Sequence, residues 1–287
     1  MGQALRRSLP YRSRNSSGAI LFVAVGAIAV LSILALGATS SVLQELKLAK
    51  FVTETDTSPY LAQSAVDIMK VFLSNDATPQ AVTLYDLRKR EIPLGDKVLL
   101  IMPQDEQSKI NLDLATKEIL NRIPGLSGQT QLIDAVFGAN IALKEELLLL
   151  DGMTQEIYGQ LKGLTTVFGL GMVNINTAQP DVLSAQGMDS DLIEKIQEYR
   201  AGDDATEATE DDKPFANPPE IITQLTNLGI NPVQQQVIQN LLSTMQLGTT
   251  TDCVSFDITV LQGKKNVRFF KVTVNLVKGT IVFWHEE

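Results

Sequence analysis

The 287-residue chain has very few of the side chains that most often carry out chemistry, with one cysteine, Cys253, and one histidine, His285. A single cysteine excludes an internal disulfide and a cluster of thiolate metal ligands. A single histidine excludes a zinc site built on two histidines. A Ser-His-Asp triad would require His285, close to the end of the sequence, to fold back into a cleft. We therefore predict that the chain is not an enzyme.

Basic residues are scarce outside the N-terminus. The net charge is −9, and residues 1–18 carry four arginines and no acid, so the remaining residues carry −13. An acidic body repels phosphate backbones, so nucleic acid is not expected as a partner. The negative charge is compatible with a divalent cation or a basic protein surface as a binding partner. The 44% apolar content is that of a folded globular protein.

The longest apolar run is AILFVAVGAIAVLSILALG, residues 19–37, in which Ser32 is the single polar side chain. As a helix it spans about 28 Å, close to the hydrocarbon thickness of a bilayer. The arginines before it favour a cytoplasmic N-terminal side. Composition alone leaves three interpretations open, namely a cleaved secretory signal, a plain signal anchor and a more specialised membrane-spanning helix.

The apolar run continues as an amphipathic pattern, which predicts one helix over residues 19–52. Pro59 blocks continuation and biases Ser58 away from helical angles, so a break is expected over Thr53–Pro59. A second helix follows. Its apolar face is expected to consist of Tyr60, Leu61, Ala65, Ile68, Met69 and Phe72.

Residues 112–248 are predicted to be almost entirely helical, with turns at glycines. Within this block Thr177 is expected to cap a helix that has Pro180 in its first turn and Gly187 at its end. A second helix is predicted over Ser190–Arg200, terminated by Gly202.

Strands are predicted on both sides of this helical block. The apolar run Lys97–Met102, bounded by turn residues and Pro103, predicts one strand. Alternating apolar residues predict three antiparallel strands over Cys253–Leu261, Val267–Val277 and Thr280–Trp284. The second helix and the strand at 97–102 can supply the partner layer that three strands need. The predicted fold class is α+β, with the helical block inserted into the sheet's sequence.

Six carboxylates fall within residues 203–212. A solvated and even disordered loop explains them. The functional alternative is calcium, because clustered flexible carboxylates suit this hard cation. No EF-hand spacing is present, so no metal ligands are assigned. Phe215 follows the loop and is an expected core anchor.

The arginine-rich leader, Gly18 and the apolar helix resemble the N-terminus of type IV prepilins and pseudopilins. In that family a prepilin peptidase cleaves after the glycine, which implies cleavage between Gly18 and Ala19. Most members have Phe first and Glu fifth after the cut, whereas this chain has Ala19 and Val23. Both departures resemble the K-type, or large, minor pseudopilin of the type II (general) secretion pathway. A buried carboxylate needs a neighbour's charge, so the apolar Val23 suits a subunit with nothing above it.

Two internal segments also resemble the K-type pattern, D-E-x-x-K-I-N-L after a strand and V-N-I-N-T-A after a Leu-rich helix. The matches follow in order over most of residues 105–225, although Asp113 stands where a second Asn is usual. The resemblance implies a pseudopilin fold, with a long N-terminal helix on an antiparallel sheet and a large all-α insertion containing helix-hairpin-helix or SAM-like pairs. The residues of the two motifs are Asp105, Glu106, Lys109, Asn111, Asn174, Asn176 and Thr177.

The same resemblance implies a subunit at the tip of the secretion pseudopilus that initiates or caps the filament and supports export of folded proteins across the outer membrane. Its implied partners are other minor pseudopilins, the prepilin peptidase, the inner-membrane assembly platform and secreted substrates. It would lie in the inner membrane with a cytoplasmic leader and a periplasmic bulk. The implied segments are a leader (1–18), a transmembrane and stem helix (19–52), a pilin-type α/β part (53–111), an inserted helical domain (112–248) and C-terminal strands (249–287).

A rival interpretation rests on the two short helices that follow N-I-N-T-A. They resemble the helix-hairpin-helix of competence-type DNA receptors, so the alternative function is a membrane-anchored protein that binds DNA outside the inner membrane. Those receptors hold a DNA phosphate on a Gly-rich turn flanked by basic residues. The turn here, AQGMDSD, has Gly187 alone and two acids, Asp189 and Asp191. The sequence favours a shared fold without DNA binding.

Overall fold

The computed structural model of the chain describes residues 17–74, 81–263 and 265–287, so residues 1–16 of the predicted leader lie outside the described residues. The chain divides into two compact units, Met1–Asp56 and Thr57–Glu287. Residues 17–56 of the first unit are helical, as part of α1 (Ser17–Ser74). Leu21–Lys50 contains an 18-residue stretch with a mean hydropathy of 2.6, and none of its side chains is buried. By length and composition, this segment can cross a membrane, as the sequence predicted.

The predicted break over Thr53–Pro59 is wrong, because α1 continues through Pro59. An interior proline removes a backbone hydrogen bond and costs on the order of 3 kcal/mol. The residues that follow offset this cost, since Ala62, Val66 and Met69 are fully buried in a core that the helix shares with a sheet. Burial in the tertiary structure overrides the local preference.

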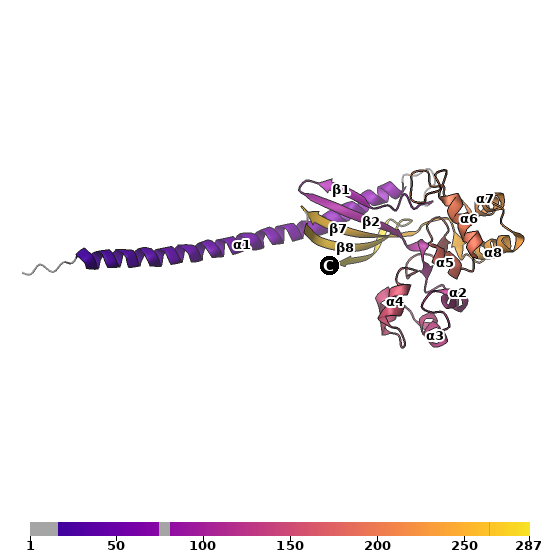
Figure 1. The fold of residues 1–287 in the computed structure, drawn as a ribbon, viewed down its shortest axis with the longest axis horizontal. Helices are drawn as coiled ribbons and strands as arrows, with labels where there is room; N and C mark the ends of the chain where they lie inside the picture. The colour runs from indigo at the N-terminus through magenta and orange to yellow at the C-terminus, as the bar shows by residue number, and fades with distance from the viewer. Residues whose placement is uncertain (1–16, 75–80, 264) are drawn as a thin grey trace, which may run out of the picture. The chain divides into compact units, whose positions relative to one another are not determined.

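The second unit contains a five-stranded antiparallel sheet in the order β1-β2-β7-β8-β9 (Figure 1). The three C-terminal strands are confirmed, and the strand predicted at 97–102 is found beside the first of them. β1 was not predicted. The strands are β1 (Arg90–Leu94), β2 (Lys97–Asp105), β7 (Cys253–Gln262), β8 (Lys265–Asn275) and β9 (Thr280–Glu286).

β2 runs past its predicted end at Met102 and continues through Pro103 to Asp105. The pairing of β1 with β2 stops at Ile101, so Pro103 lies where β2 has β7 as its one neighbouring strand. Proline is tolerated in a strand where its missing N–H is not needed for a ladder. This extension carries the strand directly into the predicted Asp105 motif.

The face of α1 that packs on the sheet differs from the predicted one. Ala65 and Met69 are buried as expected, whereas Tyr60, Ile68 and Phe72 are 77%, 44% and 39% exposed. This part of the helix is apolar on more than one side, so contact with the sheet decides which side is buried. The buried stripe consists of Ala62, Ala65, Val66, Met69 and Leu73, and it meets Leu99, Ile101, Val254, Phe256, Ile258, Val260, Phe270, Val272 and Val274.

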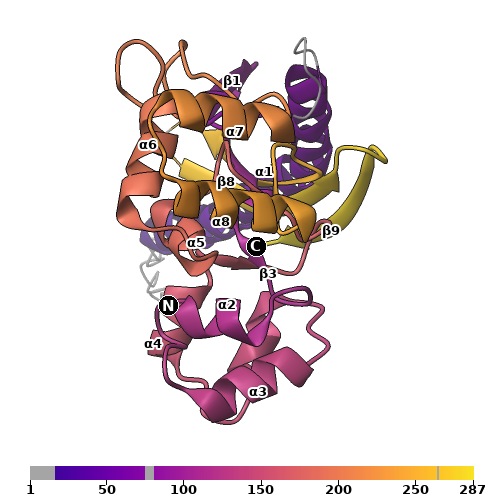
Figure 2. The same cartoon turned by 90° about the vertical axis from the view of Figure 1, so that its right-hand side faces the viewer.

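Between β2 and β7 the chain forms a block whose longer elements are all helices, although turns and loops take up far more of residues 112–248 than predicted (Figures 1 and 2). Its α-helices are α2 (Lys117–Arg122), α3 (Thr130–Gly138), α4 (Gln155–Leu161), α5 (Pro180–Ala185), α6 (Ser190–Arg200), α7 (Pro218–Asn227) and α8 (Pro232–Ser243). Two 3₁₀ helices, η1 (Glu106–Ser108) and η2 (Lys144–Leu149), complete it.

Two short parallel strand pairs within this block were not predicted. β3 (Ile110–Asn111) pairs with β4 (Thr165–Thr166), and β5 (Val173–Asn174) pairs with β6 (Leu247–Gly248). β3 follows β2 closely and β6 precedes β7 closely. The two pairs therefore fasten both ends of the helical block where it joins the sheet.

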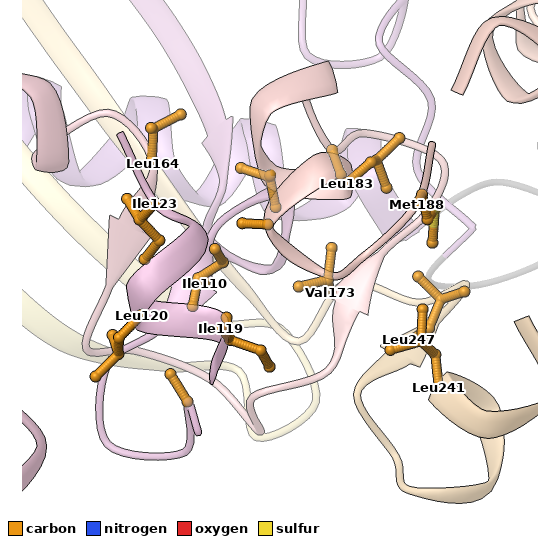
Figure 3. Close-up of a cluster of buried hydrophobic side chains, with 14 of the residues drawn as sticks. Ile110, Ile119, Leu120, Ile123, Leu164, Val173, Leu183, Met188, Leu241 and Leu247 are labelled. Atoms are coloured by element: carbon orange, nitrogen blue, oxygen red, sulfur yellow. The ribbon is translucent and has the colours of Figure 1, made fainter. Parts of the chain in front are cut away.

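The helical block has an apolar core of its own, distinct from the core between α1 and the sheet (Figure 3). In this core Ile119 and Leu120 of α2 and its C-cap residue Ile123 are buried together with Val173 of β5. Phe215 is fully buried, which confirms the predicted anchor, and its ring stacks on Tyr199 with centroids 4.2 Å apart.

The helix pair α5 and α6 corrects one prediction and confirms another. Gln179, not Thr177, is the N-cap of α5, because the Thr177 hydroxyl donates a hydrogen bond to Asp105 instead. α6 spans Ser190–Arg200 as predicted. Gly202 follows it at φ 69°, a left-handed conformation that favours glycine.

Candidate functional site

The structure gathers the seven motif residues into a buried polar network where β2 enters the helical block. Each of the seven is less than 9% exposed. Asp105, the last residue of β2, caps η1 by accepting a 2.8 Å hydrogen bond from the backbone N–H of Gln107. Its Oδ2 accepts from Asn174 at 2.9 Å, Thr177 at 2.5 Å and Thr251 at 2.8 Å. The two motifs, distant in sequence, therefore meet at one carboxylate.

Asp105 is surrounded by neutral donors. Burial disfavours its charged form and raises its pKa from 3.8 to about 6, although hydrogen bonds from Thr177, Asn174, Thr251 and Gln107 oppose the rise. The carboxyl group is therefore ionised at neutral pH at a cost that its donors offset only in part.

The neighbouring Glu106 has a different environment. Its carboxylate accepts from the hydroxyls of Thr166 and Ser255, each at 2.5 Å, and pairs with the Lys109 ammonium at 3.1 Å. Burial raises its pKa, but the charges of Lys109 and Lys144 and the two hydroxyls outweigh burial and hold the pKa below its usual value. Glu106 and Lys109 therefore form a buried, hydrogen-bonded ion pair.

Two of the three motif asparagines, Asn111 and Asn176, hold backbone segments. Asn111 donates to the carbonyls of Phe168 and Gly169 at 3.2 and 3.3 Å. Asn176 donates to the carbonyls of Phe215 and Thr249 at 3.1 and 3.0 Å and accepts from the Phe215 N–H at 2.8 Å. These contacts satisfy buried backbone groups that lie outside regular ladders.

Sequence reasoning missed four members of the network, Gln107, Thr166, Thr251 and Ser255. The side-chain Oε1 of Gln107 accepts from the backbone N–H groups of Asp252 and Cys253, both at 2.9 Å. Gln107 lies inside the first motif, at a position where the family pattern allows any residue, so the pattern gave no signal for it. The hydroxyl residues belong to β4, to β7 and to the chain between β6 and β7, and they carry no local signature.

The network is buried, and its side-chain donors and acceptors are matched except at Nε2 of Gln107, which has no hydrogen-bond partner among the described residues. Its parts come from β2, η1, β3, β4, β5 and β7, so it ties the start of the helical block to its end and to the sheet. A buried polar network of this kind holds the elements that it connects in one fixed arrangement. Its role is therefore structural, namely to connect the helical block to the sheet.

The predicted processing residues lie elsewhere. Gly18 and Ala19 fall in the first turn of α1, and Val23 follows in the same helix, 70% exposed. They belong to the first compact unit.

The acidic loop 203–212 has a defined conformation. Asp211 accepts from the backbone N–H groups of Asp203 and Asp204 at 2.7 and 3.0 Å, and hydrogen bonds, that of Thr209 first, lower its pKa to about 2. Glu207 pairs with Arg200. Within residues 17–74, 81–263 and 265–287, no group of three or more His, Cys, Asp or Glu side chains is arranged to hold a metal ion.

The hairpin between α5 and α6 is acidic in the structure too. Asp189 caps α6 by accepting from the Leu192 N–H at 2.8 Å. The Gln234 amide of α8 donates to both Asp189 and Asp191, at 2.9 and 2.8 Å. Two carboxylates at the tip of the hairpin oppose the binding of a phosphate.

No protein-family model matches the chain, and no curated protein matches it. A solved structure does. It is a chain of the crystal structure of the GspK-GspI-GspJ complex from the type 2 secretion system of enterotoxigenic Escherichia coli. The match covers 85% of this chain and 99% of that chain, with a TM-score of 0.59 and 12% identity. The likeness establishes a shared fold. The predicted α+β class, with a long N-terminal helix, an antiparallel sheet and further helices, is confirmed.

Proposed function

We propose that the chain is a large minor pseudopilin of the K-type in a type II secretion system, and that it acts as a structural subunit without enzymatic activity. The observation that carries the proposal is the fold it shares with a chain of a complex of that system, over 99% of that chain. The apolar segment Leu21–Lys50 supplies the membrane part that such a subunit needs. The burial of all seven motif residues in one network gives the resemblance in sequence a structural reason.

The proposed setting is the inner membrane, with residues 1–18 as a cytoplasmic leader and the bulk of the chain in the periplasm. The proposed partners are other minor pseudopilins, the prepilin peptidase, the assembly platform and secreted substrates. The structural neighbour is named for a complex of three components, which supports partners of the first kind. The segment boundaries inferred from the resemblance, at 18, 52, 111 and 248, are part of this proposal.

The tip of the filament is the proposed position. The helical block between β2 and β7 adds an entire second core to the sheet and α1. Close-packed interiors cannot be compressed, so such heads would collide if they were repeated along a tight helical filament. Val23, which lacks a carboxylate to pair with a neighbour's amine, suits the same end position.

Processing of the N-terminus tests the proposal. We expect mass spectrometry of the mature protein to find Ala19 as its first residue, and Gly18→Val to leave the precursor uncut. Gly26→Val is the matched control, because a side chain at Gly26 meets nothing within 4 Å, and it should be cleaved normally. A mature start near Ala38 would indicate an ordinary secretory signal and would rule out the filament subunit.

A further inference from the structure

The two edges of the sheet differ in how well they are protected. β1, at one edge, contains Pro93 and the charged residues Arg90 and Glu91, which discourage the pairing of a further strand. β9, at the other edge, contains no proline, and its one acidic residue, Glu286, is paired with Arg268 of the neighbouring strand at 3.3 Å, while its Ile281 and Val282 are 37% and 49% exposed.

The second half of β9 is a regular open edge. The register with β8 shifts at Val282, and from Phe283 to Glu286 each residue pairs in order with β8. Glu287 extends this ladder by exchanging two hydrogen bonds with Phe269, at 3.1 and 2.9 Å. In an antiparallel ladder alternate residues point their N–H and C=O groups away from the neighbouring strand. Among the described residues, no backbone hydrogen bond joins residues 280–286 to any strand other than β8.

A cavity of about 420 Å³ lies beside this edge. Phe269 and Phe283 of the sheet and Phe168 of the helical block are among its walls, and Leu143 also lines it. The rings of Phe168 and Phe283 are 5.9 Å apart, and His285 stacks on Phe283 at 6.3 Å. The size and the aromatic lining suit one large apolar side chain.

The charged groups of the cavity include both signs. Lys144 and Lys271 lie in its wall with three acids, Glu145, Asp257 and Glu287, and His285 lines it as well. Lys144 already donates to the Lys162 carbonyl at 2.9 Å. Oδ1 of Asp257 is buried with no hydrogen-bond partner among the described residues. A wall that offers both ammonium donors and a carboxylate acceptor favours a neutral occupant that has N–H and C=O groups of its own, as a peptide backbone does.

We propose that Phe283–Glu287 binds an extended segment of a partner protein as a sixth strand of the sheet, with an aromatic or large aliphatic side chain of that segment in the cavity. The open backbone supplies affinity and the cavity supplies specificity, as in strand addition generally. The partner segment is neutral and alternates apolar and polar residues, because side chains on one face of the new strand would lie over the cavity while the others face away.

The test uses the full chain in detergent micelles and a blocked heptapeptide in which phenylalanine and valine alternate with threonine. Trp284 is the single tryptophan of the chain and lies between Phe283 and His285, so its fluorescence reports occupancy of the edge. We expect a saturable change. A peptide of the same sequence with N-methyl groups on alternate amides should bind at least about tenfold more weakly, because it cannot complete the ladder.

Two variants distinguish binding in the cavity from nonspecific binding to exposed apolar side chains. Leu143→Asp changes a cavity wall outside the sheet and should weaken binding at least about tenfold, whereas Leu149→Asp, at an 82% exposed leucine that does not line the cavity, should leave binding unchanged. Equal binding of the N-methylated peptide, equal effects of the two variants, or no saturable binding would overturn the proposal. A dimer of the chain that the heptapeptide dissociates would also overturn it, in favour of pairing between two copies.

Discussion

Two adjacent carboxylates show how strongly the immediate surroundings set acidity in this protein. Asp105 and Glu106 are both almost fully buried, yet the pKa of Asp105 is raised and that of Glu106 is lowered. The difference comes from positive charge, because the Lys109 ammonium lies 3.1 Å from Glu106 and Lys144 also lowers its pKa, whereas the donors to Asp105 are neutral. A neighbouring positive charge outweighs burial where neutral hydrogen bonds do not.

Replacement of Asp105 by asparagine should therefore change how stability depends on pH. The folded pKa, about 6, lies above the ordinary value of 3.8. Between pH 4 and 6 the folded state holds a proton that the unfolded state has released, so stability falls as the pH rises. Asp105→Asn lacks this titration, so the wild type should lose on the order of 3 kcal/mol relative to the variant between pH 4 and pH 7. Urea unfolding across this range measures the difference.

Glu106→Gln is the matched control for this experiment. Its lowered pKa stabilises the fold above the unfolded pKa, and this contribution is lost as the pH falls. The unfolding free energy of the wild type should therefore increase relative to that of Glu106→Gln as the pH rises. The raised pKa of Asp105 would be contradicted if the difference in unfolding free energy between the wild type and Asp105→Asn did not change with pH. A difference that grew in favour of the wild type as the pH rises would contradict it as well.

Gly169 is a position where the addition of a single Cβ atom should affect the stability of the fold. It has φ 87°, and a Cβ there would lie 1.6 Å from Nε2 of Gln107, the side chain that holds the start of β7. Gly169→Ala should destabilise the fold by about 2–4 kcal/mol, since it adds a clash to left-handed strain. Gly128→Ala has a similar φ of 77° with open space around it and should cost about 1–2 kcal/mol. Equal costs in thermal unfolding would show that Gln107 moves freely.

At the scale of elements, the C-terminal part of α1 is defined by the side that it buries. The segment after Pro59 is apolar on more than one side, and the sheet selects Ala62, Val66 and Met69 for burial. The opposite side of the helix, which includes Tyr60 and Ile68, is exposed in the second compact unit.

Two alanine substitutions one position apart test this orientation. Met69→Ala empties part of the core between α1 and the sheet and should cost about 2–4 kcal/mol of unfolding free energy. Ile68→Ala, at a side chain that is 44% exposed, should cost less than about 1 kcal/mol. Comparable losses in the two variants would mean that the helix packs on the side predicted from its periodicity.

At the scale of the whole molecule, the proposed tip position predicts the number of copies of the chain in each filament. We expect about one copy per filament, because a head with two cores cannot be repeated in a close-packed shaft. Gold-labelled antibody against residues 112–248 should mark one end of each overexpressed pseudopilus. Label spread evenly along the shaft would contradict the tip position.

Val23→Glu tests the same position from the membrane side. The substitution supplies the carboxylate that most family members carry, so it should allow the subunit to enter below another and block growth. Shorter filaments and reduced secretion are expected. Unchanged filament length would argue that Val23 has no part in placing the subunit.

The sequence by itself determined the features that depend on local pattern. A long run without charged residues predicts the apolar helix, alternation of apolar and polar residues predicts the three C-terminal strands, and a helical apolar pattern that ends before Gly202 predicts α6. The motif residues were chosen by resemblance, and their joint burial follows from long-range folding rather than from any local signal.

The tertiary structure alone decided the features that depend on partners distant in sequence. It kept α1 helical through Pro59, because burial against the sheet offsets the lost hydrogen bond. It drew Thr177 from its predicted cap to Asp105, 72 positions away, because a buried carboxylate needs more donors than its own strand provides. The short pairs β3–β4 and β5–β6 arose in the same way, since two-residue strands have no pattern to detect and exist only where folding brings their partners together.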